Sequence, residues 1–314
     1  MTARHCRRFM EQSLKNRLTY GPMMLAALFG LLWLDHAIQR WTGHWITDNG
    51  REVGLAGVGL LLLLLALIPL ATYELAHLFA AEKVKPYRTI SSVGSSLLIL
   101  HAFFTQFAEF RPYGTSTLAF IIVLVMLLAA LMRALGKQTQ EAIHHMAGTV
   151  LATMYLGGLA WFLMALRVKY SLHFQGSTFI LLTILLAVKF TDIGAYFGGR
   201  ALGRHKLIFW LSPGKTWEGL ICGMFTAGLI AAACSPWINY RDGYGYNLPW
   251  WKGFLFGMVI GGIGQVGDLL ESLMKRDAEV KDSGKLIPGF GGVLDVIDSP
   301  LLAAPFAYLI FSLL

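Results

Sequence analysis

Residues 253–300 read GFLFGMVIGGIGQVGDLLESLMKRDAEVKDSGKLIPGFGGVLDVIDSP. An apolar run comes first, a dense block of acids and bases follows from Asp268 onward, and a second apolar stretch begins near Val293. Charged side chains bounded by lipid-soluble helices cost free energy to place, and such residues are usually functional. This stretch therefore predicts a membrane protein with a functional site between two of its spans.

The composition of the whole chain agrees with a membrane protein. Of its 314 residues, 56% are hydrophobic and only 14% are charged, whereas soluble domains are nearer a quarter charged. A helical span needs about 20 apolar residues. Stretches of that kind lie at 21–40, 53–80, 90–110, 115–133, 147–166, 177–198, 219–239, 253–271 and 293–314. The sequence thus predicts an all-α polytopic integral membrane protein with about nine transmembrane helices, in which a basic arm (1–20) precedes a single membrane domain (21–314).

The net charge of +8 is typical either of nucleic-acid binding or of positive loops on the cytoplasmic side of a membrane. With the N-terminus placed inside, eighteen Lys and Arg residues fall in the inside segments and seven in the outside ones. This asymmetry predicts a cytoplasmic N-terminus and puts the charged block on the side where nucleotides are. We therefore expect membrane lipids, and no nucleic acid, among the partners.

Acidic residues gather at the ends of two predicted spans. Asp268, Glu271 and Lys275 have helical spacing and so share one face of a helix. Asp295 and Asp298 are likewise one turn apart at the start of the last span. Carboxylate oxygens suit hard cations, and magnesium in particular bridges carboxylates to substrate phosphates. The alternative interpretation is that acids at the start of a helix only stabilise it by interacting with the helix dipole.

A second polar group lies upstream of this block. Lys189 and Asp192 are one turn apart within an apolar stretch, so they are expected to pair or to face one cavity. Ser212, Lys215 and Thr216 follow in SPGKT, which resembles the end of a P-loop, but the first glycine of that motif would fall on a phenylalanine. We therefore expect a different phosphate cradle, made of hydroxyls, an ammonium and the start of a helix. The alternative is an ordinary helix start.

Other polar residues are interpreted as structural. Glu74 and His77 share a helix face, but no third residue lies at metal-ligand spacing. The cysteines Cys6, Cys222 and Cys234 have no metal-like spacing either, and we expect them to be packing residues.

Three blocks of the sequence resemble one known family. The stretch S-L-M-K-R-x4-K-D-x-G-x2-I-P-G-x-G-G-x-L-D-x-x-D-S, from Ser272 to Ser299, is similar to the signature of phosphatidate cytidylyltransferases. The elements D-I-G-A-Y-x-x-G-R from Asp192 and S-P-x-K-T-x-E-G from Ser212 resemble two further blocks of that family in the same order. The resemblance is strong over about residues 189–300, which is therefore the predicted catalytic portion.

The resemblance implies a reaction. CTP and phosphatidate, or a related lipid phosphate, would give CDP-diacylglycerol and pyrophosphate by in-line attack on the α-phosphorus, with Mg²⁺ as cofactor. Together with the topology above, it implies a site that faces the cytoplasm from the cell (inner) membrane, and it leaves a homodimer open. It assigns metal binding to Asp268, Asp295 and Asp298, catalysis to Asp298, Lys275, Lys281 and Asp282, and substrate binding to Ser212, Lys215, Thr216, Arg276 and Asp192.

The chain departs from the family pattern at three positions. Phe290 stands where the family usually has histidine, Val296 where it has arginine, and Gly214 where lysine is common. The first two changes remove an imidazole and a bidentate phosphate partner, so we expect a substrate or a rate unlike those of the typical member. Two alternatives stay open. One is a CTP-dependent lipid kinase of the polyprenol type, and the other is a transporter or non-catalytic homologue, whose expected signature is repeated broken helices.

Overall fold

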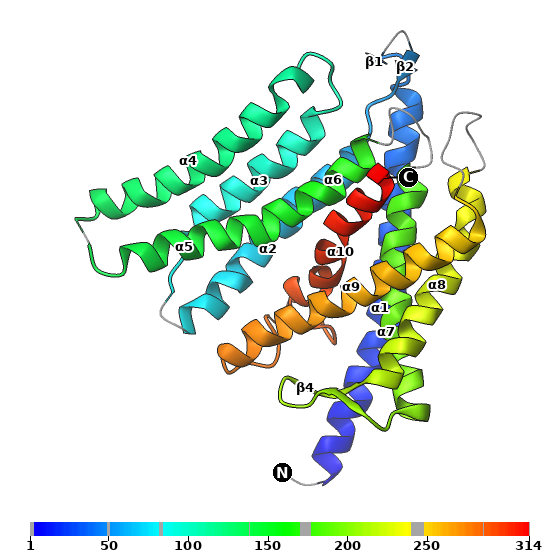
Figure 1. The fold of residues 1–314 in the computed structure, drawn as a ribbon. Helices are drawn as coiled ribbons and strands as arrows, with labels where there is room; N and C mark the ends of the chain where they lie inside the picture. The colour runs from blue at the N-terminus through cyan, green and yellow to red at the C-terminus, as the bar shows by residue number, and fades with distance from the viewer. Residues whose placement is uncertain are drawn as a thin grey trace.

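The computed structural model describes residues 3–48, 51–81, 84–137, 139–169, 177–239, 248–284 and 286–313. They form a helical bundle with two short hairpins (Figure 1). The helices are α1 (Ala3–Trp41), α2 (Val58–Ala81), α3 (Arg88–Phe104), α4 (Gly114–Leu135), α5 (Ala142–Thr153), α6 (Leu159–Lys169), α7 (Ser177–Leu202), α8 (Trp217–Asn239), α9 (Trp250–Asp277) and α10 (Leu294–Leu313). The side chains of residues 1–18, most of the predicted basic arm, lie outside the described part.

Short elements connect these helices. A 3₁₀ turn, η1 (Arg111–Tyr113), precedes α4, and a π-helical turn, η2 (Met154–Gly158), joins α5 to α6 without a break. Strand β1 (Ile46–Asp48) pairs with β2 (Arg51–Val53), and β3 (Lys206–Ile208) pairs with β4 (Ser212–Thr216), both antiparallel. The second hairpin joins α7 to α8.

Within the described residues, eight helical segments are long and apolar enough to cross a bilayer. This confirms the prediction of an all-α polytopic membrane protein. The span expected at 90–110 corresponds to α3, which has 17 residues. At 1.5 Å per residue it is about 26 Å long, a little less than the roughly 30 Å hydrocarbon core. The count of nine spans and the cytoplasmic N-terminus stay predictions.

The helices α7, α8 and α9 pack with their backbones close together. A Cβ on Gly223 of α8 would lie 2.6 Å from the carbonyl oxygen of Thr191 in α7, and one on Gly257 of α9 would collide with the carbonyl oxygen of Ala227 in α8. Small residues let membrane helices approach in this way. These three helices therefore form one tight unit, in which α7 carries Lys189 and Asp192 and α9 carries Asp268 and Glu271.

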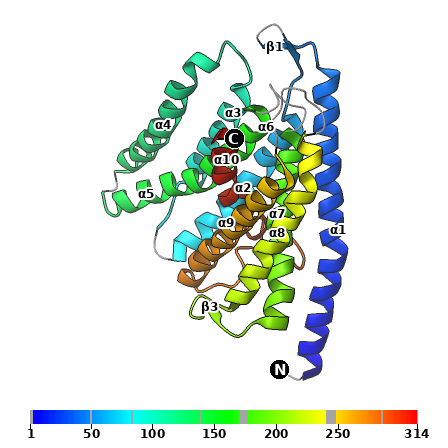
Figure 2. The same ribbon diagram turned by 45° about the vertical axis from the view of Figure 1, so that its right-hand side comes forward.

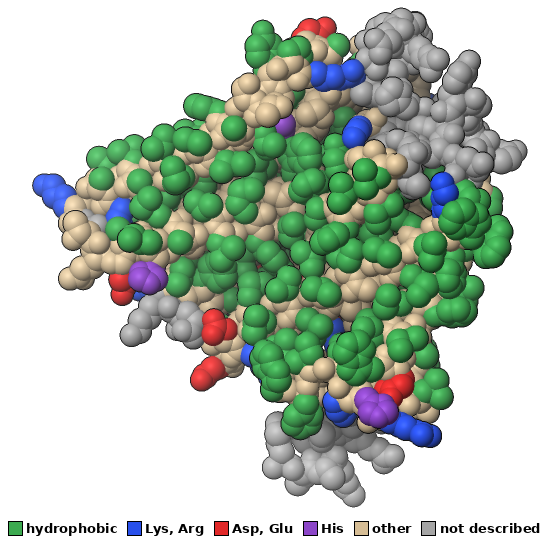
Figure 3. All heavy atoms as spheres, viewed as in Figure 1, with side chains coloured by type: hydrophobic (Ala, Val, Ile, Leu, Met, Phe, Trp, Pro, Cys, Tyr) green, Lys and Arg blue, Asp and Glu red, His purple; other side chains and the backbone are tan. Residues whose placement is uncertain are grey.

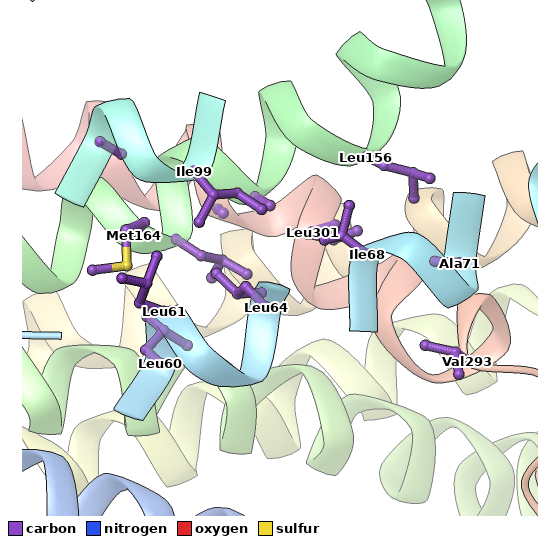
Figure 4. Packing of buried hydrophobic residues seen from close by; sticks show 14 of the residues in the cluster. Leu60, Leu61, Leu64, Ile68, Ala71, Ile99, Leu156, Met164, Val293 and Leu301 are labelled. Carbon is purple, nitrogen blue, oxygen red and sulfur yellow. The ribbon is translucent and has the colours of Figure 1, made fainter. Parts of the chain in front are cut away.

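Helix α10 lies between two apolar clusters. One cluster draws on α2, η2 and α10 among other elements, and includes Ile68, Leu156 and Leu301 (Figure 4). The other joins α7, α9 and α10 and includes Ile184 and Phe311. Helix α10 thus connects the first half of the chain to the unit of α7, α8 and α9.

Helices α1 and α4 lie at the edges of the bundle (Figures 1 and 2). Only 11% of the residues in the most apolar part of each is buried. Hydrophobic side chains cover much of the outer face (Figure 3). An apolar surface of this extent marks contact with a membrane.

A buried ion pair fastens α1 to the bundle. Asp35 of α1 and Arg167 of α6 are both fully buried, with Arg167 Nε 2.7 Å from Asp35 Oδ2. Arg167 also donates to Gln39 Oε1 at 2.8 Å and to Ser177 Oγ at 2.7 Å, and the Gly59 N–H donates to Asp35 Oδ1 at 2.8 Å. Each guanidinium nitrogen therefore has an acceptor, which is the condition under which a buried charge is tolerated.

Candidate active site

The β3–β4 hairpin brings the upstream polar group against α9 (Figure 1). Lys215 Nζ lies 2.6 Å from Asp268 Oδ2, and Arg276 Nε donates to the carbonyl oxygen of Leu211 at 3.5 Å. Because α9 runs to Asp277 rather than to the predicted end at 271, Arg276 is still part of the helix. The two polar blocks of the sequence thus lie side by side.

Three carboxylates form what we call the acidic group, between α9 and α10. Asp268 and Glu271 come from successive turns of α9 and Asp298 from the start of α10, and one oxygen of each lies within 4.8 Å of the others. Glu271 and Asp298 are only 1% and 2% exposed. Asp268 is half-buried and pairs with the hairpin lysine.

The acidic group suits a divalent cation. Its donors are all carboxylate oxygens, which are the ligands that magnesium and calcium prefer. Among the described residues, Glu271 Oε1 is buried and has no hydrogen-bond partner. A buried polar atom without a partner is costly unless something binds beside it. The residues present therefore fit a metal ion.

Asp295 lies outside the acidic group, and other residues hold it. Its Oδ1 accepts from Lys275 Nζ at 2.7 Å, and its Oδ2 accepts from the N–H groups of Ser283 and Gly292 at 3.1 and 2.6 Å. Lys275 also donates to Glu271 Oε2 at 3.0 Å. Lys275 therefore connects Asp295 to the acidic group, while both oxygens of Asp295 are already hydrogen-bonded.

Glu74 of α2 caps α10 from the other half of the chain. Its carboxylate is 4% exposed and accepts from the N–H groups of Val293 and Leu294 at 3.0 and 2.9 Å, and from the Ser283 hydroxyl at 3.2 Å. The N–H groups at a helix start have no partner within the helix and need such an acceptor. Glu74 thus fixes the first turn of α10, which leads to Asp298.

The glycine-rich loop before α10 turns tightly and contacts α1. Gly289 and Gly291 have φ angles of 86° and 100°, in a region that favours glycine. Between them Phe290 is half-buried, and its Cζ lies 3.4 Å from where a Cβ on Gly21 of α1 would be. This side chain, which stands where the signature has histidine, therefore packs against α1. At the other departure, the carbonyl oxygen of Val296 accepts from Lys189 Nζ at 3.4 Å.

A cavity of about 370 Å³ lies between the hairpin and helices α7, α8 and α9. Its polar lining comprises Asp192, Lys215, Thr216, Gln265 and Asp268. Gln265 donates to Asp192 Oδ1 at 2.6 Å. Since Asp268 belongs both to the lining of the cavity and to the acidic group, the cavity opens onto the acidic group. The volume of the cavity is within the range of small-molecule sites.

The two hydroxyls of the predicted phosphate cradle differ. Thr216 is buried, and its Oγ1 accepts from the Gly219 N–H at 3.1 Å at the start of α8. The alternative interpretation, an ordinary helix start, therefore describes Thr216, although it also lines the cavity. Ser212 begins β4 and is half-buried.

The structure brings most of the predicted site residues together. Of the three predicted metal ligands, Asp268 and Asp298 share the acidic group, and Glu271 joins them instead of Asp295. Lys281 and Asp282 lie on the loop between α9 and α10 and are exposed. Arg276, near the end of α9, is also exposed. Lys285, in the same loop, lies outside the described residues.

Two residues of the site, Glu271 and Glu74, had no role there predicted from the sequence. Glu271 shares a helix face with Asp268, so its spacing was a signal for a common function. Glu74 gave no such signal, because 219 residues separate it from Val293, one of the donors it accepts from. Only the packing of α2 against the loop reveals its contribution.

Comparisons with known proteins cover most of the chain. Residues 53–314 match the Cytidylyltransferase family. A phosphatidate cytidylyltransferase of Bacillus subtilis is 31% identical over 256 residues, which are 82% of this chain and 91% of that protein. Those of Haemophilus influenzae and Synechocystis sp. are 42% identical over 153 residues and 43% identical over 141 residues. These two matches cover 48% and 44% of this chain and span about half the length of the relatives, 52% and 45%.

Proposed function

Since this chain belongs to the cytidylyltransferase family, we propose that it transfers the cytidylyl group of CTP to phosphatidate or a related lipid phosphate. The products are CDP-diacylglycerol and pyrophosphate. The Bacillus subtilis relative has the corresponding name and aligns along 91% of its length. Family membership favours this reaction over a polyprenol-type kinase and over a transporter or non-catalytic homologue.

One structural observation carries the proposal: the acidic group lies at the edge of a cavity that also holds a lysine. A nucleotide phosphate needs cationic partners, and Lys215 offers one at the point where the cavity meets Asp268. A metal ion needs oxygen ligands at the same place, and the acidic group supplies them. A membrane-embedded arrangement of this kind suits one water-soluble substrate with phosphates and one lipid substrate.

We propose Mg²⁺ as the cofactor, held by Asp268, Glu271 and Asp298. When bound, such an ion neutralises charge on phosphate oxygens and on the leaving pyrophosphate. Asp295 then supports the acidic group through Lys275 and does not bind the ion directly. This proposal follows from the hydrogen bonds that already occupy both oxygens of Asp295.

The chain's own side chains bind and orient the reactants. Lys215 exchanges its pairing with Asp268 for a phosphate oxygen of CTP, while the exposed Arg276 and Lys281 attract the outer phosphates. An oxygen of the lipid phosphate attacks the α-phosphorus as the bond to pyrophosphate breaks. A phosphate monoester is largely ionised at pH 7, so no base has to remove a proton. The reaction therefore does not need an imidazole at Phe290.

We also propose that the protein lies in the cell (inner) membrane with this site facing the cytoplasm. The excess of Lys and Arg in the segments on the side of the N-terminus supports this orientation. In Figure 1 the β3–β4 hairpin and the N-terminus lie toward the same end of the bundle. CTP is then available to the cavity from solution, and the lipid substrate from the inner leaflet.

The test is turnover by the purified protein in micelles that contain phosphatidate. We expect pyrophosphate release from CTP to require both phosphatidate and Mg²⁺. Glu271→Gln and Asp298→Asn should lower kcat by about 100-fold or more, as is usual when a group that stabilises the transition state is removed. The exposed Asp277, also on α9 but outside the acidic group, provides a matched control, and Asp277→Asn should stay within about twofold of the wild type.

Two results would contradict the proposal. Release of CDP in place of pyrophosphate would indicate a kinase. Untouched CTP in the presence of several lipid phosphates, with a folded protein, would indicate that the chain is not an enzyme of this class.

A further inference from the structure

A tyrosine from the first half of the chain has an unused hydroxyl and packs on the same apolar cluster as the start of α10. Tyr155 belongs to η2, in the continuous helix that runs from α5 into α6. Its hydroxyl oxygen is buried and has no hydrogen-bond partner among the described residues. Buried hydroxyls are normally hydrogen-bonded, so an exception in a native structure points to a partner that binds there.

Tyr155 packs against the apolar cluster to which Leu294 and Leu301 of α10 belong, on either side of Asp298. Besides its own burial, the charges of Asp298 and Glu271 act on the Tyr155 hydroxyl. The neighbouring Leu156 belongs to the same apolar cluster as Val293, which directly precedes α10, and Leu301, which lies within α10 (Figure 4). Tyr155 and the first turns of α10, which carry Asp298, therefore border the same apolar cluster.

The backbone at Tyr155 departs from the regular α-helix. Residues Met154–Gly158 form a π-helical turn. The extra residue of such a turn rotates the side chains on either side by about 100° relative to one another, and turns of this kind occur often at functional sites. Close packing holds this one in place, since a Cβ on Gly157 would collide with the backbone of Ser95 in α3.

Tyr155 and Glu271 have complementary unused hydrogen-bonding capacity. The hydroxyl offers a donor, and Glu271 Oε1 is a buried acceptor without a partner among the described residues. A cation bound at Glu271 retains other oxygen ligands, from water or from a phosphate. Such an oxygen can accept a hydrogen bond from the hydroxyl. Binding of the cation then gives both Tyr155 and Glu271 a partner.

We propose that Tyr155 is a positioning residue of the acidic group, whose hydroxyl donates a hydrogen bond to an oxygen ligand of the bound cation. The inference rests on the proposed cation site and adds to it a residue from outside residues 189–300. The accepting oxygen belongs either to a water molecule or to the phosphate of the lipid substrate. Tyr155 then links the first half of the chain to the chemistry of the second.

The test is Mn²⁺ binding to the purified full chain with Tyr155→Phe, which removes only the hydroxyl. Electron paramagnetic resonance of free Mn²⁺ gives the dissociation constant without CTP, first without and then with phosphatidate. We expect the dissociation constant to rise about 10–100-fold, as for other groups that orient metal ligands. A rise in both conditions identifies water as the accepting oxygen, and a rise only with phosphatidate identifies the phosphate.

The melting temperature without divalent cations separates this role from a structural one. If the hydroxyl has no partner within the protein, Tyr155→Phe should melt at the same temperature as the wild type or higher, because a buried unpaired polar group has been removed. Tyr308→Phe is a matched control. Tyr308 is half-buried, packs on Trp161 and Phe162 at the edge of the same cluster, and lies about three turns further along α10 than Asp298.

Three results would overturn the inference. Wild-type Mn²⁺ binding by Tyr155→Phe in both conditions would refute the role of the hydroxyl and leave the cation site standing. A lower metal-free melting temperature would show that the hydroxyl is bonded within the protein. A wild-type chain that binds no Mn²⁺ would refute the cation site itself, and the inference with it.

Discussion

Replacement of Glu74 by glutamine tests whether the first half of the chain holds the active site in shape. The buried carboxylate accepts three hydrogen bonds, two at Oε2 from Leu294 and Ser283 and one at Oε1 from Val293. Glutamine has the same size but only one acceptor oxygen. Its oxygen should take the place of Oε2, so its NH₂ group would face the N–H of Val293 and leave that donor unpaired. An unsatisfied buried N–H costs about 1–3 kcal/mol.

The unpaired N–H destabilises the glycine-rich loop and the first turn of α10. A change of about 1–3 kcal/mol in a local equilibrium alters its populations by a factor of about 5–150. We therefore expect Glu74→Gln to lower kcat at least about fivefold and to lower the melting temperature. Glu74→Ala leaves all three donors unpaired and should have a larger effect on both.

The assay combines pyrophosphate release with thermal unfolding in the same micelles. Glu109, which is exposed between α3 and η1, provides the control, and Glu109→Gln should leave both quantities unchanged. The reasoning is refuted if Glu74→Gln matches the wild type in kcat and melting temperature, or if alanine is tolerated better than glutamine. Either result would mean that the start of α10 does not depend on this carboxylate.

Three further changes test other parts of the structure. Arg167→Met should lower the free energy of unfolding by about 3–5 kcal/mol, because Asp35 is left buried without its partner, and adding Asp35→Leu should restore much of the loss in thermal unfolding. Gly257→Ala should lower the free energy of unfolding by about 1–3 kcal/mol, because the methyl group would meet a backbone carbonyl of α8. Gly30→Ala is the control and should melt like the wild type, since its Cβ would meet no atom within 4 Å. Lys215→Gln should raise the KM for CTP about tenfold or more with little change in the KM for phosphatidate, since a charge-assisted contact is lost; equal effects on both substrates in initial-rate measurements would contradict the assignment.

Local sequence was enough to predict the helices, because each membrane span must satisfy its own backbone hydrogen bonds. Helix α2, for example, was expected at 53–80 and extends over Val58–Ala81. The ends of helices were harder to predict. Helix α6 continues to Lys169, so Arg167, one residue beyond the span expected at 147–166, is fully buried within a helix. Nothing near Arg167 in the sequence distinguishes it from a loop charge, since its partner Asp35 lies 132 residues earlier.

Helical spacing predicted which acids share a face, but it did not predict which oxygens are available. Asp295 and Asp298 have the same spacing as Asp268 and Glu271, yet only Asp295 falls outside the acidic group. Its oxygens are occupied by donors from the end of α9 and from the glycine-rich loop. That competition is set by tertiary packing, which no pattern along one helix records.

The pair of Asp35 and Arg167 also constrains how the protein is inserted during synthesis. The two residues are 132 positions apart, and ribosomes add about 5–20 residues per second, so Asp35 is made roughly 7–26 s before its partner. An unpaired acid within a membrane helix costs about 2.5–3.5 kcal/mol on insertion scales. We therefore expect α1 to remain at the translocon or near the lipid head groups. It would pack against the bundle only after α6 has emerged from the ribosome. Attachment of the first helix would then be a late event in biogenesis, and a chain truncated before Arg167 would keep α1 detached.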